Sequence, residues 1–250
     1  MSVVYLVRHG QASFGAADYD VLSELGHRQA ALAGAALRER GVDVSLAVSG
    51  TLRRQRETAA AALAAYAGAQ AAAQPVAGGG AGLALAGDAG AWTGESEIDA
   101  RWNEYDQDWL ASGVTDPAKP PAQRVSTSSG ISSRDFQRLL DTALLEWITR
   151  DAGGSGSYRA FSDGVINALD GLFGRLGSGG TAIIFTSGGP IAAVCARLLG
   201  LAPESLVQLN RVAMNGGLTK IVSGRSGASL ISFNEHAHID AAGREFLSYR

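Results

Sequence analysis

The chain has 250 residues, and 21 Lys and Arg against 24 Asp and Glu leave a formal net charge of only −3 at pH 7. This length suffices for one substantial core, while the charge provides no basic face for nucleic acid and no apolar run is long enough for a membrane span. The single cysteine, Cys195, excludes a disulfide within the chain, and we interpret it as a core thiol of a cytoplasmic protein.

The first part of the chain alternates short apolar runs with helical patterns. Residues 2–7 are β-branched and aromatic without alternation, which is typical of a strand buried on both faces. A helix is predicted from Ser23, a capping residue, to Gly41. A second buried strand follows over residues 42–50, then a second helix over residues 51–68, with Gly68 as its stop. This order favours a parallel α/β sheet.

The middle of the chain has weaker patterns. Residues 69–90 are low in complexity and rich in Ala and Gly. Residues from about 112 to 133 are rich in Pro, Ser and Thr, which indicates an inserted lid. Two amphipathic helices are predicted next, over residues 134–149 and 162–176. We expect a single domain over residues 1–250 that carries this lid.

The last part of the chain returns to buried strands. Residues 181–187 predict a third buried strand, and a helix over residues 189–200 begins at its tip. Two further strands, residues 217–223 and 228–234, are joined by the turn G-R-S-G and are predicted to pair antiparallel.

The predicted strands end on residues that can carry chemistry. Arg8, His9 and Gly10 follow the first strand in Y-L-V-R-H-G-Q-A-S-F-G, Arg54 lies just beyond the second, and Ser187 ends the third. Because the carboxyl ends of parallel strands meet at one edge of a sheet, we expect these residues to lie together. Two arginines beside an imidazole suit a phosphate monoester, and a neutral imidazole can attack phosphorus.

Four motifs occur in a fixed order: L-V-R-H-G-Q, L-S-E-L-G-H-R-Q-A, L-R-R-Q-R-E-T-A and, later, N-E-Y-D. In this order they resemble the histidine phosphatase superfamily, in its phosphoglycerate-mutase-like branch. The family pattern has R-H-G, then L-[ST]-x-x-G-x-x-Q-A, then a segment close to S-x-L-x-R-A-x-Q-T-A, where Glu57 replaces the usual glutamine here. The resemblance implies a three-layer α/β/α fold with a mostly parallel central sheet and an inserted lid.

The resemblance also implies a role for each matching residue. His9 would accept the phosphoryl group, and Arg8 and Arg54 would bind its oxygens. Glu104, in R-W-N-E-Y-D, would protonate the leaving alcohol. The reaction would be hydrolysis of a small phosphorylated substrate through a phosphohistidine, with no metal or other cofactor. Two side chains in the loop after the first strand are further candidates for phosphate or substrate contact: Gln11 and Ser13.

The third strand tip departs from the family pattern. Most members carry a second histidine there, in a context like S-H-G-G, whereas Ser187 stands at that place in F-T-S-G-G-P. Losing a preorganised donor typically costs on the order of 10²–10³ in rate. One interpretation is that Ser187 works with the Gly188 and Gly189 amides, and another is that His236 or His238, near the end of the last strand, supplies an imidazole. A third is a phosphate binder without useful turnover. We favour the first, because the nucleophile and both arginines are retained.

Two alternatives to a phosphatase stay open. Mutases of the family open with R-H-G-[EQ]-S-x-W-N, but Phe14 and Gly15 hold the last two places here, which disfavours a phosphoglycerate-mutase-type phosphotransferase. A catalytically weak phosphate- or phosphoprotein-binding module would keep the same residues. His236 and His238, two residues apart on a predicted strand, would share a face without a third metal ligand. The sequence leaves open the substrate and the oligomeric state, a homodimer included.

Overall fold

The computed structural model describes residues 1–13, 20–72, 94–106, 110, 133–150, 153–154 and 156–249. Within these residues, six strands form one sheet in the order β3-β2-β4-β1-β5-β6. The strands are β1 (Ser2–Arg8), β2 (Leu46–Ser49), β3 (Glu97–Ile98), β4 (Thr181–Thr186), β5 (Leu218–Gly224) and β6 (Gly227–Glu235). β1 to β4 run parallel to one another, and β5 runs antiparallel to both β1 and β6. The sheet is therefore mixed but mostly parallel, as expected.

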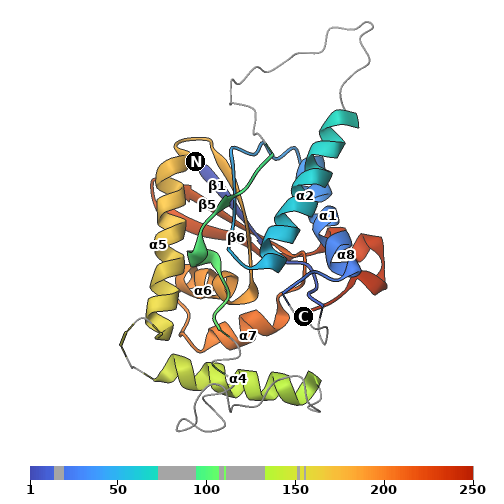
Figure 1. Ribbon diagram of the computed structural model, residues 1–250. Helices are drawn as coiled ribbons and strands as arrows, with labels where there is room; N and C mark the ends of the chain where they lie inside the picture. The colour runs from blue at the N-terminus through green and yellow to red at the C-terminus, as the bar shows by residue number, and fades with distance from the viewer. Residues whose placement is uncertain are drawn as a thin grey trace, which may run out of the picture.

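Helices cover both faces of the sheet and make three layers (Figure 1). Successive residues of β1 face opposite layers: Val4 and Leu6 contact the core under α5 (Tyr158–Leu176) and α6 (Gly188–Leu199), and Tyr5 and Val7 contact the core under α1 (Glu24–Glu39) and α2 (Arg53–Ala72). Burial on both faces explains why the β1 sequence shows no polar alternation. The remaining helices are α4 (Ser133–Thr149), α7 (Ser205–Val212), α8 (Ala237–Ala242) and the 3-10 turns η1 (Ala100–Trp102) and η3 (Arg244–Phe246).

Most of the expected elements are present close to their predicted bounds. The Ser23 hydroxyl caps α1 by accepting from the Gly26 N–H at 3.1 Å. β5 and β6 pair antiparallel, with Gly224 opposite Gly227 at the predicted turn. Cys195 is a buried free thiol on α6, and burial raises its pKa to about 12. The predicted lid falls almost wholly on residues 111–132, which lie outside the described residues.

Three predicted boundaries are wrong, and one of them is the start of α5, which lies at Tyr158 instead of residue 162. The second strand covers only residues 46–49 of the expected 42–50, although Val42 and Val44 are buried in the core. Gly68 does not stop α2, which continues to Ala72. A glycine inside an exposed helix disfavours the helix by only ~1 kcal/mol, and the alanines on either side of Gly68 are the strongest helix formers. The helix therefore runs through it.

The two C-terminal histidines do not lie on a strand. β6 ends at Glu235 after Asn234 adopts a left-handed backbone, with φ 56°. His236 precedes α8 and His238 lies in its first turn, so the expected shared strand face does not exist. Asparagine tolerates this left-handed backbone. The Asn234 side chain also fixes the bend, because its oxygen accepts from the Met214 N–H and its NH₂ group donates to the Val212 carbonyl oxygen.

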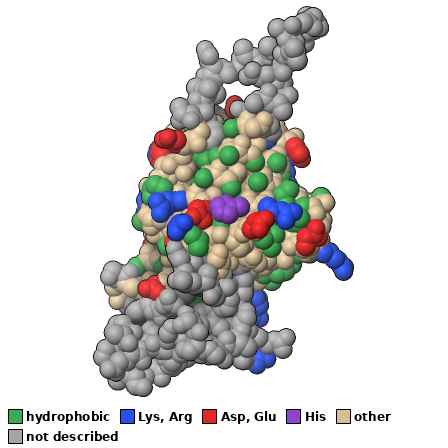
Figure 2. Space-filling view, turned by 45° about the vertical axis from the view of Figure 1, so that its right-hand side comes forward, with side chains coloured by type: hydrophobic (Ala, Val, Ile, Leu, Met, Phe, Trp, Pro, Cys, Tyr) green, Lys and Arg blue, Asp and Glu red, His purple; other side chains and the backbone are tan. Residues whose placement is uncertain are grey.

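The surface shows charges of both signs side by side. Figure 2 shows Lys and Arg close to Asp and Glu across one face, without a large area of one sign. This mixture agrees with the small net charge of −3. In the part of the chain that the structure describes, no helix combines the length and the apolar character that a membrane crossing would require.

Candidate active site

The tips of three neighbouring strands end at the same level of the sheet. β1 pairs with β4 so that Arg8 lies opposite Thr186, and β2 pairs with β4 so that Ser49 lies opposite Phe185. The His9 N–H continues the β1–β4 ladder by donating to the Thr186 carbonyl oxygen at 2.8 Å. The parallel register therefore brings the residues after each strand to one edge, as the sequence predicts.

His9 is a buried imidazole with a defined tautomer. Its Nδ1 lies 2.8 Å from the Gly10 carbonyl oxygen, which only accepts hydrogen bonds, so Nδ1 carries the proton and Nε2 keeps a lone pair. Burial lowers the pKa of His9 well below 6.5, and the nearby Arg54 and Arg8 lower it further. The imidazole is therefore neutral near pH 7, as a nitrogen nucleophile must be.

Backbone contacts hold the His9–Gly10 turn on both sides. The Asn215 amide donates to the His9 carbonyl oxygen at 2.9 Å, and the Thr58 hydroxyl accepts from the Gly10 N–H at 3.1 Å. A Cβ on Gly10 would lie 2.2 Å from the Gly26 carbonyl oxygen. Gly10 therefore allows the turn to approach the start of α1, which is a packing reason for this glycine.

Arg8 lies against the C-terminal part of the chain. Its side chain is buried, and Nη1 donates to the carbonyl oxygens of Ala213 and, at 3.0 Å, Tyr249. These contacts fix the guanidinium beside the β1 tip. The start of α6 lies beside Arg8, since a Cβ on Gly188 would be in ordinary contact with Arg8 Nε, at 3.6 Å.

Arg54 approaches the same site from the first turn of α2. Its side chain is buried, and Nη1 bonds to Asp20 Oδ1 at 2.6 Å. Asp20 also accepts from the Arg53 backbone N–H at 2.7 Å, so one carboxylate holds both the helix start and the arginine. The sequence offered no signal for Asp20, which lies between the first strand and α1.

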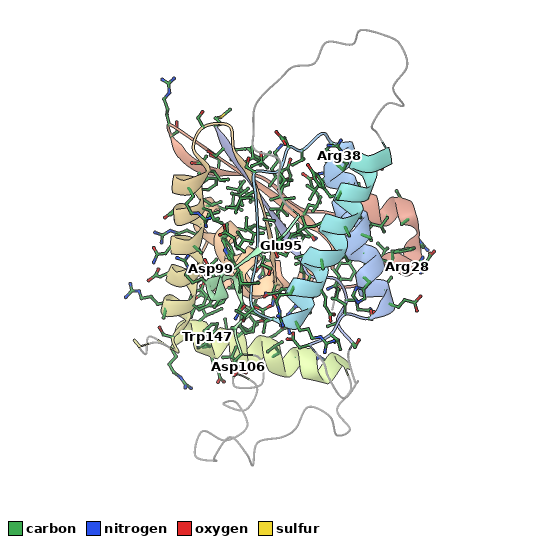
Figure 3. All side chains as sticks on the ribbon, turned by 45° about the horizontal axis from the view of Figure 1, so that its top comes forward. Arg28, Arg38, Glu95, Asp99, Asp106 and Trp147 are labelled. Carbon is green, nitrogen blue, oxygen red and sulfur yellow. The ribbon has the colours of Figure 1, made fainter. Side chains whose placement is uncertain are left out.

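Glu104 reaches the site from the segment after η1. Asp99 lies beside α5 and Asp106 near α4, so this segment leads from α5 towards α4 (Figure 3). Both carboxylate oxygens of Glu104 accept from the Gly189 N–H in the first turn of α6, at 3.1 and 3.2 Å. Burial raises the pKa of Glu104 above 4.5, although Arg54, the Gly189 amide and Arg8 oppose that shift. A raised pKa suits a group that must carry a proton.

Ser187 is fully buried at the junction of β4 and α6. Its side chain does not cap α6, and instead its hydroxyl oxygen accepts from the Gln55 amide at 2.8 Å. A Cβ on the adjacent Gly188 would lie 2.0 Å from Asn210 Oδ1, so a side chain there would displace the Asn210 amide. Ser187 and Gly188 follow β4, which is the strand next to β1 and its His9, and Gln55 contacts Ser187 from α2.

The two loop candidates after β1 are engaged by protein contacts. The Gln11 side-chain oxygen accepts from the Ser23 hydroxyl at 2.8 Å, and the Gln11 N–H donates to Gln29 Oε1 at 2.9 Å. The Ser13 N–H donates to the Val21 carbonyl oxygen at 2.8 Å. Both side chains are half-buried, and their contact with a phosphate or substrate stays a prediction.

The C-terminal histidines bond elsewhere. His238 Nε2 lies 3.0 Å from the Gly216 carbonyl oxygen, and His236 Nδ1 lies 2.6 Å from the Asn234 carbonyl oxygen. Both contacts support the turns around β5 and β6. Across the described residues, His, Cys, Asp and Glu form no group of three or more that could hold a metal ion.

Three further residues of the site were not found from the sequence. Besides Asp20, these are Asn215, which holds the His9 backbone, and Gln55, which contacts Ser187. Gln55 had a signal in the sequence, because it occupies the alanine place of the R-A-x-Q-T-A pattern. Asn215 had none, since it lies 206 residues from His9.

Comparisons with known proteins agree with this geometry. The family model described as "Histidine phosphatase superfamily (branch 1)" matches residues 4–155. Among curated proteins, none matches the sequence significantly. Solved structures share the fold, among them three enzymes at 16–20% identity. A mycobacterial glucosyl-3-phosphoglycerate phosphatase matches at TM-score 0.58 and 20% identity, over 93% of this chain and 98% of that one.

The other two structures are a phosphatase and a mutase. Phosphoserine phosphatase from Entamoeba histolytica matches at TM-score 0.54 and 16% identity, over 96% of this chain and 100% of that one. Phosphoglycerate mutase from Bacillus anthracis matches at TM-score 0.57 and 18% identity, over 95% of this chain and 94% of that one. At these identities the likeness concerns the fold.

Proposed function

Since the chain belongs to the histidine phosphatase superfamily, we propose that it is a phosphomonoesterase that works through a phosphohistidine on His9. The observation that carries this proposal is the state of His9: a buried, neutral imidazole with its proton fixed on Nδ1, beside two buried arginines. The family and its structural neighbours support a phosphatase or phosphotransferase activity in general. The assignment to hydrolysis of small phosphate monoesters rests on the residues.

In the first step, the Nε2 lone pair of His9 attacks phosphorus, and the bond from phosphorus to the ester oxygen breaks. Arg8 and Arg54 hold the phosphoryl oxygens, whose charge an arginine fork matches in geometry and sign. Glu104 gives its proton to the leaving oxygen, so an alcohol departs rather than an alkoxide. The phosphorylated ring of His9 that forms is positively charged, and its charge lies beside the negative charge of the phosphoryl group.

In the second step, water attacks the phosphohistidine. Glu104, now a carboxylate, takes a proton from the water, and the bond from phosphorus to Nε2 breaks. Inorganic phosphate leaves, and His9 and Glu104 return to their starting protonation states. The Gly189 amide stabilises the Glu104 carboxylate between the two steps, because both of its oxygens accept from that N–H.

The test is to trap the intermediate. Brief incubation with an aryl phosphate, an acid-free quench and mass spectrometry should find one phosphoryl group on a peptide containing His9. His9→Ala should abolish both the label and the hydrolysis, whereas His27→Ala, which removes an exposed histidine, should change neither. If the His9→Ala variant keeps its rate, the nucleophile has been assigned wrongly.

The same experiment separates the alternatives. A binding module would give no label and no phosphate release, and a phosphotransferase would form the label but pass it to an added alcohol or phosphoglycerate rather than to water. Comparing released phosphate with transferred phosphate, over a panel of phosphorylated metabolites, also identifies the substrate class.

A further inference from the structure

Gln55 is a buried carboxamide directly behind Ser187. It lies in the first turn of α2, next to Arg54, and none of its surface is exposed. Its Nε2 donates to the Trp102 carbonyl oxygen at 2.9 Å and to the Ser187 hydroxyl oxygen at 2.8 Å. Gln55 therefore links α2, the segment that carries Glu104, and the tip of β4.

The direction of these hydrogen bonds is fixed by their partners. The Trp102 carbonyl oxygen only accepts, so the atom that faces it must be the NH₂ group of Gln55. One amide hydrogen goes to Trp102 and the other to Ser187, and the Ser187 oxygen is therefore an acceptor in this contact. Its own hydrogen has to point away from Gln55.

The Ser187 hydroxyl hydrogen is left for a ligand. Among the residues that the structure describes, the Ser187 hydroxyl makes no hydrogen bond besides the one that it accepts from Gln55, although Ser187 is fully buried. Buried hydroxyl donors nearly always have a partner. The start of α6, which follows Ser187, lies beside Arg8 and Glu104: a Cβ on Gly188 would be 3.6 Å from Arg8 Nε, and the Gly189 N–H donates to Glu104.

We propose that Gln55 is a positioning residue that locks the Ser187 hydroxyl as a hydrogen-bond donor to the transferring phosphoryl group. This inference rests on the proposed function. In the family pattern, alanine occupies the Gln55 place and histidine the Ser187 place. The two departures touch each other, and Gln with Ser contains as many side-chain heavy atoms as Ala with His. The pair therefore occupies a similar volume and keeps one donor at the strand tip.

The contact between Gln55 and Ser187 leaves one polar atom of Gln55 without a partner, which lowers the stability of the fold. The Gln55 side-chain oxygen is buried without a hydrogen-bond partner, and it lies where a Cβ on Gly50 would be, at 1.9 Å. An unsatisfied buried carbonyl is destabilising. Gln55→Met has a similar shape and would leave no such oxygen, and the Trp102 carbonyl oxygen that loses the amide would still accept from the Thr186 hydroxyl.

A double-mutant cycle tests the coupling. Gln55→Met should lower kcat on an aryl phosphate about 10- to 100-fold and weaken inhibition by vanadate in parallel, with KM nearly unchanged, because removing a transition-state donor outright typically costs ~10²–10³. In a Ser187→Ala background, Gln55→Met should lower kcat less than twofold, since the hydroxyl that it orients is gone.

Gln29→Met is the matched control. Gln29 is equally buried but bonds to Phe246 and Ser248 rather than to Ser187, so its effect on kcat should multiply with that of Ser187→Ala. Equal effects of Gln55→Met with and without the Ser187 hydroxyl would overturn the inference. Urea unfolding of each variant shows that the comparison is between folded proteins.

A second test places histidine, the residue of the family pattern, at position 187, and it predicts a gain of activity only when Gln55 is also replaced. Ser187→His alone should lose activity, because the imidazole would meet the carboxamide that now lies 2.8 Å from the Ser187 hydroxyl oxygen. Ser187→His with Gln55→Ala should be at least tenfold more active than either single variant. Full activity of Ser187→His alone would contradict the proposal. If His9→Ala also stays active, the proposed function has failed, whereas an inert His9→Ala with multiplicative Gln55 effects defeats this inference only.

Discussion

At the scale of single residues, the site depends on two groups whose protonation is set by burial in opposite senses. Burial and the two arginines lower the pKa of His9 well below 6.5, and burial raises the pKa of Glu104 above 4.5. Burial disfavours the charged form of each group, and so it favours the neutral imidazole and the protonated carboxyl. This is the pair of states that the first chemical step requires.

The pH dependence of kcat follows from these directions. Activity falls on the acid side as His9 gains a proton, and a lowered pKa moves that limb below pH 6.5. It falls on the alkaline side as Glu104 loses its proton, and a raised pKa moves that limb above pH 4.5. We expect a bell-shaped profile with an optimum in the acidic range. The profile should be measured as kcat, since kcat reports groups in the complex and avoids the ionisation of free substrate.

Glu104→Gln should remove the alkaline limb and lower kcat on alkyl phosphates by roughly 10²–10⁴. The loss on an aryl phosphate should be much smaller, because a phenolate leaves without needing the proton. Both substrates serve as controls for each other in the same protein. An unchanged alkaline limb in Glu104→Gln would assign it to another group.

The residues at the strand tips could be predicted, and their supports could not. His9, Arg8 and Ser187 follow buried strands, and parallel strands end at one edge, so local patterns sufficed. Asn215 and Gln55 act through contacts across 206 and 132 residues of sequence. The alanine place of the family pattern marks Gln55 as unusual, but no periodicity or motif spacing records the contacts that these two residues make.

At the scale of elements, the strongly patterned strands and capped helices could be predicted, and the elements without local patterns could not. β3 has only two residues, and α7 and α8 are short, so tertiary contacts decide them. The end of α2 was misplaced because a glycine that disfavours a helix does not by itself terminate it. The layers follow from burial of β1 on both faces.

The α1–α2 contact provides a prediction at this scale. A Cβ on Gly34 of α1 would lie 1.9 Å from the Ala62 carbonyl oxygen of α2, so Gly34→Ala should destabilise the fold by roughly 1–3 kcal/mol. Gly68, on α2, is its matched control, because a Cβ there meets nothing within 4 Å. Gly68→Ala should stabilise by about 0.5–1 kcal/mol.

Urea unfolding of the two alanine variants measures both free energies. A similar shift for Gly34→Ala and Gly68→Ala would mean that the close approach of α1 and α2 relaxes without loss.

At the scale of the whole molecule, the first strand and the C-terminal segment complete one site. Ser248 accepts from Gln29 Nε2 and donates to Asn215 Oδ1, both at 2.9 Å, and Asn215 in turn holds the His9 carbonyl oxygen. Tyr249 accepts from Arg8 one residue further on. The segment therefore supports both the nucleophile and one arginine.

Ser248→Ala should destabilise the fold by about 1–3 kcal/mol, because the buried Asn215 Oδ1 loses its donor and the Gln29 amide keeps only its bond to the Phe246 carbonyl oxygen. It should also lower kcat several-fold, since the His9 turn loses its support. Ser229→Ala, at an exposed serine of β6, is the control and should change neither quantity. Thermal unfolding and aryl phosphate hydrolysis on the same samples measure both, and a stability loss with unchanged kcat would show that the His9 turn is held by other contacts.

The hold on Arg8 has a kinetic consequence for folding. The contact between Arg8 and Tyr249 spans 241 residues, and contacts between distant residues form late, after the entropy of closing long loops has been overcome. The pairing of β1 with β4 also joins residues far apart in the sequence, since Val3 lies opposite Thr181. Neither the imidazole of His9 nor the guanidinium of Arg8 is therefore held in place until distant parts of the chain have been brought to the β1 tip.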